Sequence, residues 1–322
     1  MPSRPLRAFV LALLSGLAVP AGAASDPHLD PALVPGGCRT CHAGHGRPGS
    51  PMLGRPQKEV CLSCHGSRSS ADAVITAGLM APHARPPLLE KDLTQPYVHA
   101  LSREAFSRHE EGVVVCTSCH SPHRRSIVPV DDTPGSYKRR STRDSTRFEY
   151  ELCQACHGAL GAVTQSRLDI SRLLDPGNRS YHPVQAPANQ ASPSLPEKAR
   201  LRQMSCTDCH GSSREGSRGL HGSAVPHLLR RTYRAFDGVA DPLRTYELCF
   251  DCHDPKVVLS ESSLFPGHVS HVTQRGASCS TCHDPHGSVR NRALVRFGDD
   301  STKSGALASL SSCTRAITVG PA

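Results

Sequence analysis

Seven copies of the motif Cys-x-x-Cys-His run through the chain and constrain its fold more than any other feature. They take up 14 of the 15 cysteines in 322 residues. The paired cysteines are Cys38, Cys41, Cys61, Cys64, Cys116, Cys119, Cys153, Cys156, Cys206, Cys209, Cys249, Cys252, Cys279 and Cys282. The histidines that follow them are His42, His65, His120, His157, His210, His253 and His283. A spacing repeated this often points to one shared chemistry.

That spacing is typical of covalent c-type haem attachment. Two thiols on one turn of chain reach the two vinyl groups of a porphyrin, and the next histidine points its imidazole at the iron. Disulfides, zinc sites and redox dithiols are the alternatives. None of them requires a histidine directly after every cysteine pair, so we expect seven covalent haems c.

The composition indicates an interior that is filled by something other than side chains. Aromatic residues make up only 4% of the chain, tryptophan is absent, and there are 26 glycines and 27 prolines. Such a chain has few large apolar groups to bury. We therefore predict a haem-organised fold, mostly irregular with short α-helices and little or no β-sheet. The helices should lie near the motifs, for example at residues 150–157 and 246–253.

The N-terminus has the pattern of a secretory signal peptide. Arg4 and Arg7 precede an apolar run at residues 8–19, and small residues at 21–23 provide a cleavage site. An uncleaved membrane anchor is the alternative, although the run is short for a bilayer. We expect export to the periplasm or the outer surface, with no transmembrane segment once residues 1–23 are removed.

The formal net charge of +9 does not indicate a nucleic-acid partner. Removal of Arg4 and Arg7 and addition of two propionates per haem would bring the net charge to about −7. Basic clusters such as residues 138–140 should pair with propionates or stay solvated. The partners that we expect are redox proteins, such as an inner-membrane quinol-oxidising cytochrome or an outer-membrane cytochrome.

The motifs form pairs, which indicates an internal repeat. Residues 150–153 and 246–249 both read Tyr-Glu-Leu-Cys. We predict haem-pair units at residues 24–80, 81–175 and 176–260 and a single-haem unit at 261–297. Residues 298–322 are interpreted as a degenerate tail, in which Cys313 marks either a lost eighth site or an unrelated free thiol.

This arrangement resembles the doubled-CXXCH multihaem cytochromes, which include cytochrome c3-like proteins and those of bacteria that respire on metals or other extracellular acceptors. Residues 245–253 (TYELCFDCH) and 265–287 (FPGHVSHVTQRGASCSTCHDPHG) carry the likeness most clearly, and it extends over roughly residues 28–297. The resemblance implies haems with two histidine ligands, a stacked row of haems, and electron transfer.

A haem of that kind needs a second axial ligand. The repeat offers one histidine upstream and one just downstream of the first motif in each unit. The candidates chosen by this rule are His28, His45, His109, His123, His182, His221, His271 (with His268 as its alternative) and His286. A downstream histidine should serve a neighbouring haem, because its own iron faces the other way. His83, His99 and His227 are left unassigned.

Three functions fit these features, and we expect the first. It is an electron carrier of anaerobic or extracellular respiration with no catalytic residues. The second is a reductase of a small nitrogen or sulfur oxyanion, which needs one haem with an open face; the chain contains no Cys-x-x-Cys-Lys motif to mark one. The third is a structural subunit of a cytochrome filament, for which a ligand such as His28 donated across a subunit boundary would be the sign.

Overall fold

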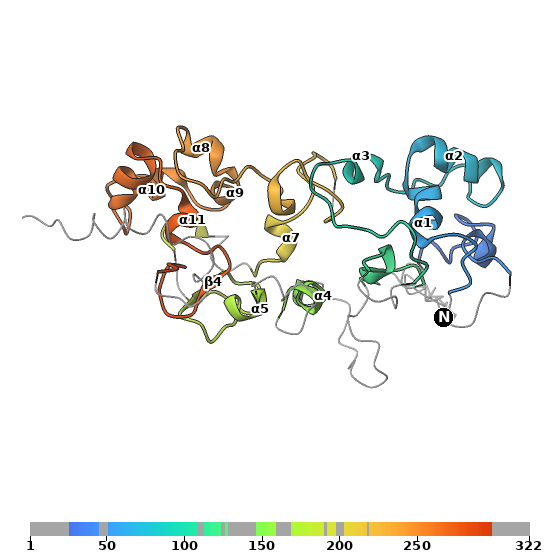
Figure 1. Ribbon diagram of the computed structural model, residues 1–322, viewed down its shortest axis with the longest axis horizontal. Coiled ribbons are helices and arrows are strands. Elements are labelled where there is room, and N and C mark those ends of the chain that lie inside the picture. The colour runs from blue at the N-terminus through green and yellow to red at the C-terminus, as the bar shows by residue number, and fades with distance from the viewer. Residues whose placement is uncertain are drawn as a thin grey trace, which may run out of the picture.

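The computed structural model describes residues 26–44, 51–107, 113–123, 126–127, 146–158, 169–189, 192–197, 203–217 and 219–297. The predicted signal peptide, the tail with Cys313, and the candidates His45 and His109 lie outside these residues. The molecule is elongated (Figure 1). The helices nearest the N-terminus form one end of it and those nearest the C-terminus form the other.

Short helices surround the motifs, as predicted. The first motif of each unit forms a single turn: η1 (Gly37–Thr40), η2 (Cys116–Ser118), α7 (Cys206–Cys209) and α11 (Cys279–Cys282). The second motif lies in or ends a helix that starts before it: α1 (Gln57–His65), α4 (Thr146–His157) and α9 (Glu247–Phe250). The helix expected at residues 150–157 is therefore confirmed, and the one expected at 246–253 is present but shorter, since α9 ends at Phe250.

The remaining helices connect the motif turns. They are α2 (Arg68–Thr76), α3 (Glu90–Leu93), α5 (Ile170–Leu173), η4 (Pro226–Leu228), α8 (Pro242–Thr245), α10 (Pro255–Val258) and the π-helix η5 (Val269–Gln274). The start of α2 is fixed by a capping box, in which the side chains of Ser67 and Ser70 each accept a hydrogen bond from the other's backbone N–H. No described helix has the length and hydropathy that crossing a membrane requires.

Regular β-structure in the described residues is confined to two short antiparallel ladders. β1 (His120–Ser121) pairs with β2 (Ser126–Ile127), and β3 (Ser180–Tyr181) pairs with β4 (Gly287–Ser288). A Cβ on Gly287 in β4 would overlap the carbonyl oxygen of Leu173 at the end of α5, so the close approach of β4 to that helix requires glycine there. The prediction of little β-sheet is confirmed.

After each first motif the chain turns back and pairs with the motif histidine. The paired residues are His42 with Leu53, His120 with Ile127, His210 with Leu229, and His283 with Val295. In three of these hairpins the returning segment has non-glycine residues at positive φ, namely Met52, His227, Leu228, Ala293 and Leu294, with φ between 53° and 61°. L-residues rarely adopt this conformation because the Cβ approaches the following carbonyl oxygen. The turns are therefore strained.

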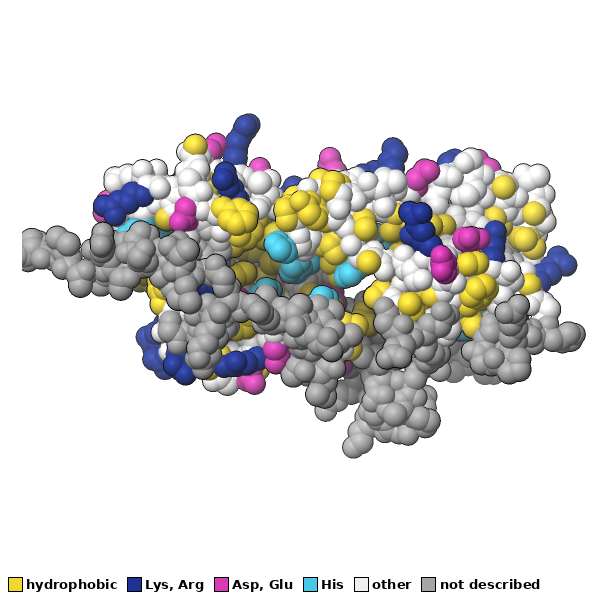
Figure 2. All heavy atoms as spheres, viewed as in Figure 1, with side chains coloured by type: hydrophobic (Ala, Val, Ile, Leu, Met, Phe, Trp, Pro, Cys, Tyr) yellow, Lys and Arg dark blue, Asp and Glu magenta, His cyan; other side chains and the backbone are white. Residues whose placement is uncertain are grey.

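The apolar clusters of the described residues are small. One consists of Ala71, Met80, Ala81 and Ala84 near α2, and the other of Val239, Tyr246 and Val272 near α9. Alanine contributes little apolar area when buried. Histidine side chains gather instead in a hollow in the middle of the molecule (Figure 2). The described residues thus bury few large apolar side chains, and imidazoles line the central hollow.

The strained turns lead to a prediction in which one substitution has opposite effects at two sites. Ala293→Gly should raise the free energy of unfolding by about 1 kcal/mol, because glycine adopts positive φ without the Cβ clash. Ala73→Gly, in the exposed middle of α2, should lower it by about 1 kcal/mol. Denaturant unfolding of the holoprotein measures both. A loss of stability in Ala293→Gly would show that the turn is not strained.

Candidate haem-binding site

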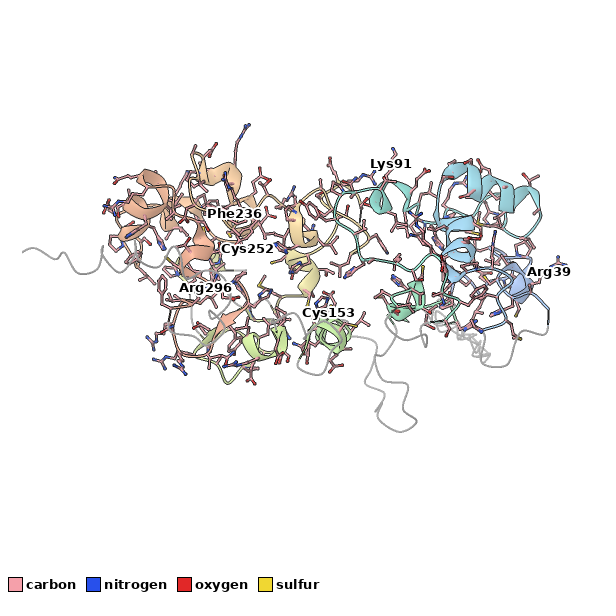
Figure 3. The ribbon with its side chains drawn as sticks, viewed as in Figure 1. Arg39, Lys91, Cys153, Phe236, Cys252 and Arg296 are labelled. Atoms are coloured by element: carbon pink, nitrogen blue, oxygen red, sulfur yellow. The ribbon has the colours of Figure 1, made fainter. Side chains whose placement is uncertain are left out.

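Within a motif, the backbone holds the two thiols and the imidazole on one turn of chain. The histidine N–H donates to the carbonyl of the first cysteine, at 2.9 Å in the motifs that end at His42, His210, His253 and His283. Cysteines three residues apart on such a turn project to the same side. Figure 3 shows Cys153 and Cys252 within the body of the molecule, whereas Arg39 and Lys91 lie at its edge.

Five motif histidines have a second imidazole at a nearly constant distance. The ring centres are 5.9 Å apart for His65 and His28, for His42 and His123, and for His120 and His221. They are 6.3 Å apart for His210 and His286 and 6.1 Å apart for His283 and His268. Aromatic rings that touch directly can have their centres equally far apart, so what sets the five pairs apart is that each joins two imidazoles across a nearly constant gap between ring centres.

The gap fits a six-coordinate metal with one imidazole on each side. Two metal–imidazole bonds of about 2 Å, each extended by about 1 Å from the nitrogen to the ring centre, place the ring centres about 6 Å apart. The rings are close to parallel in the pairs formed by His42, His120 and His210, with interplanar angles of 15°, 21° and 5°. The residues present therefore fit a haem iron between them.

The other two motif histidines also have an imidazole as a charged neighbour. Burial lowers the pKa of His157, and the charge on His99 lowers it further. Burial lowers the pKa of His253 to about 4, and His182 is the first charged neighbour that adds to the effect. Every motif histidine thus has a second histidine of the same chain close to it.

Hydrogen bonds at Nδ1 orient most of these rings. Motif histidines donate to returning-segment carbonyls: His42 to Pro51 at 2.9 Å, His210 to His227 at 2.9 Å and His283 to Ala293 at 2.7 Å. In each case the acceptor lies two residues before the residue that pairs with the motif histidine, in or beside the strained turn. A hydrogen on Nδ1 leaves the lone pair on Nε2, which is the nitrogen that then faces the metal.

The partner histidines are held in the same way. Nδ1 of His99 donates to the carbonyl of Leu220 at 3.1 Å, and Nδ1 of His182 donates to that of Pro285. His28 and His286 donate to nearby carboxylates, Asp26 at 2.9 Å and Asp284 at 3.2 Å. Because these acceptors fix the tautomer, the free nitrogen of each of these four rings is also Nε2.

Partial burial favours the neutral form of six motif imidazoles, which is the form that binds a metal. It is the leading cause of a lowered pKa in His65, His120, His157, His210, His253 and His283. In His65, His210 and His283 a backbone carbonyl opposes the shift without reversing it. The site is therefore preset for ligation near neutral pH.

The thiols of successive motifs lie next to each other. First cysteines are hydrogen-bonded in the pairs Cys61–Cys116, Cys153–Cys206 and Cys249–Cys279. The bond raises the pKa of Cys61 and lowers that of Cys116 to about 7. Second cysteines are also close together: burial raises the pKa of Cys41, Cys119 and Cys209, and the neighbouring thiols of Cys64, Cys156 and Cys252, in that order, raise it further. These six contacts link the seven motifs in chain order.

Two backbone contacts bring partner histidines from different parts of the chain together. Tyr97 pairs with Ser223, which places His99 beside the segment that carries His221. The β3–β4 ladder pairs Tyr181 with Gly287, and the N–H of His182 donates to the carbonyl of His286 at 3.0 Å. In both places an upstream histidine of one unit meets a downstream histidine of the next.

The structure bears on two of the sequence-based choices. His268 lies beside His283, whereas His271, the first choice, stacks on Phe265 with ring centres 5.9 Å apart and donates from Nδ1 to the carbonyl of Gly267 at 2.7 Å. The π-helix η5 carries His271 to this position. His99 was left unassigned. A signal for it was available, since a tyrosine shortly precedes both His99 and His182 and forms the pairing in each case.

Comparison with known proteins agrees with this site. The family described as outer membrane cytochrome MtrC/MtrF-like, domains II/IV, matches residues 113–294, and the doubled CXXCH motif family matches residues 32–70. The multiheme cytochrome MtrA of Shewanella baltica (strain OS185) is 27% identical over 220 residues. The match covers 67% of this chain and 59% of that relative. No solved structure matches.

The family match spans more than half of the chain and includes five of its seven motifs. The thiol pairs, the paired imidazoles and the gaps between their ring centres all agree with it. The chain therefore belongs to the MtrC/MtrF-like family and is a multihaem c-type cytochrome that binds haem c covalently.

Proposed function

We propose that this chain carries electrons along a row of seven haems, each held between two histidines. The observation that supports this best is the second imidazole beside every motif histidine. The proposed pairs are His42–His123, His65–His28, His120–His221, His157–His99, His210–His286, His253–His182 and His283–His268. An iron held on both faces has no free position for a substrate, which favours a carrier over a reductase.

The thiol contacts support a spatial order of haems that follows the chain. Each haem would be anchored beside the anchor of the next one, alternately through first and second cysteines. Bound haem supplies one-electron transfer. The polypeptide fixes the orientation of each haem through the Nδ1 hydrogen bonds and limits the access of water through burial of the imidazoles.

The pairing also suggests how the haem-pair units are joined. In units 24–80, 81–175 and 176–260 the second motif takes its partner histidine from its own unit, as His65 does with His28. The first motif takes its partner from the following unit, as His42 does with His123. The motif of the single-haem unit 261–297 would take its partner, His268, from its own unit, because no described unit follows it. All seven partners come from the same chain, so this pairing does not call for a filament.

We place this carrier in the periplasm or at the outer surface, after export directed by residues 1–23. Covalent haem c and the family match support a role in anaerobic or extracellular respiration. The partners that fit are other redox proteins, such as a quinol-oxidising cytochrome on one side and an outer-membrane cytochrome on the other. Electrons would enter at one end of the elongated molecule and leave at the other.

The first test is spectroscopy of the purified mature holoprotein. Its mass should show seven haem additions, and the reduced form should bind less than about one carbon monoxide per chain, because both faces of each iron are ligated. A stoichiometric fraction of high-spin haem that binds carbon monoxide or nitrite would instead favour the reductase. Zinc or disulfides in place of haem would contradict the proposal altogether.

The second test separates two histidines on one short segment. His268→Ala should convert about one haem to a high-spin form, because it removes an axial ligand. His271→Ala should leave the spectrum low-spin and is the matched control, since its ring faces Phe265. Electron paramagnetic resonance measures both. The reverse result would exchange the two assignments and leave the rest of the pairing intact.

A further inference from the structure

Asp92 is a buried carboxylate that the haem pairs do not use. It lies on α3 and is 2% exposed, whereas its neighbours Glu90 and Lys91 are exposed; Figure 3 shows Lys91 at the molecular edge. Two hydroxyls and one guanidinium satisfy it. Ser212 Oγ donates to Oδ1 at 2.7 Å, Ser217 Oγ donates to Oδ2 at 3.0 Å, and Arg214 Nη1 is 3.4 Å from Oδ2.

These three partners come from a distant part of the chain. They lie in the loop that starts after the motif histidine His210 and runs to His221. The loop is also closed on itself, since the N–H of Ser212 donates to the carbonyl of Gly219 at 3.0 Å. Because the loop carries His221 at its end, its position sets where that imidazole lies.

The contact continues from Asp92 along the segment that carries His99. Tyr97 and Ser223 exchange backbone hydrogen bonds of 3.1 and 2.8 Å. A Cβ on Gly222 would overlap the carbonyl oxygen of Asp92, so the two segments touch there without a side chain between them. The imidazole of His99 then donates to the carbonyl of Leu220 at 3.1 Å. Asp92 therefore lies at one end of a continuous contact between residues 92–99 and residues 212–223, the segments that carry His99 and His221. We call this contact the central seam.

We propose that Asp92 is a positioning residue for the partner ligands of the two central haems. It fixes the loop 212–222 against residues 92–99, so that His221 reaches the iron of His120 and His99 reaches the iron of His157. This inference rests on the proposed histidine pairs. A buried carboxylate with three polar partners is costly to lose, because removal leaves the hydroxyls and the guanidinium without their acceptor.

The other seam of this kind is built differently. At β3–β4 the buried Ser180 donates to the carbonyl of Asn291 at 2.7 Å and accepts from the N–H of Leu294 at 2.9 Å. Both bonds link the Ser180 hydroxyl to backbone groups, and neither involves a charged side chain. At the central seam the loop from His210 to His221 is longer than the segment from His283 to His286 at the β3–β4 seam. The Asp92 carboxylate therefore holds this loop in place, as the short strand ladder holds the other segment.

The experiment compares Asp92→Ala and Asp92→Asn with Glu90→Ala in the full-length holoprotein. Glu90→Ala removes an exposed carboxylate from the same helix and should leave the spectrum unchanged. Asp92→Ala should give a high-spin fraction of up to two haems per chain with the haem count by mass unchanged. Asp92→Asn should give a smaller fraction, because the amide oxygen still accepts one of the two serine hydrogen bonds.

Four further variants separate the possible failures. If His99→Ala and His221→Ala each produce one high-spin haem while Asp92→Ala produces none, the histidine pairs hold and the role of Asp92 is refuted. If neither histidine variant produces high-spin haem, the pairs themselves are wrong. If Asp92→Ala yields no folded protein, Ser212→Ala and Ser217→Ala test the seam more gently. A low yield without any high-spin signal in those two would refute positioning.

Discussion

Covalent attachment at two thiols is the constraint on which this structure depends. A porphyrin that is bonded to the chain stays in place even where few side chains surround it, so its binding does not require a deep apolar pocket. This explains how a chain with 4% aromatic residues, whose described residues form two small apolar clusters, can adopt a defined fold. As in small metal-dependent domains, we expect cofactor binding and folding to be one process.

The haems would fill the interior, and the polypeptide orients the imidazoles that hold them. In the first motif of a unit, a hairpin returns a carbonyl to the Nδ1 of the motif histidine, and in three hairpins the returning turn has non-glycine residues at positive φ. Strain of this kind persists where surrounding structure over-determines the backbone. This strain recurs at the same point of the repeat, beside the carbonyl that accepts from the motif imidazole. The imidazole is therefore oriented at the cost of backbone strain in the turn.

The sequence was informative wherever the chemistry is local. The thiols and the motif histidine lie within five residues, so their spacing alone identified them, and the helices around the motifs followed. Partner histidines depend on contacts between distant segments, such as Tyr97 with Ser223, which no local spacing reveals. His271 and His268 are chemically equal in the sequence, and only the path of the π-helix separates them. The repeat rule leaves His99 unassigned, because only the pairing of Tyr97 with Ser223 brings its segment beside another histidine-bearing segment.

The exchange of partner histidines between units has a consequence for how such chains vary in length. In the proposed pairing, a unit inserted in the middle both receives a ligand from its successor and donates one to its predecessor, so the row stays complete. Deletion of the final unit would remove His286 and leave the iron at His210 with one open face. Shortening a carrier of this design at its C-terminal end would therefore create a haem that could bind a gas or reduce a substrate. Lengthening it by an inserted unit would leave every iron with two histidine ligands.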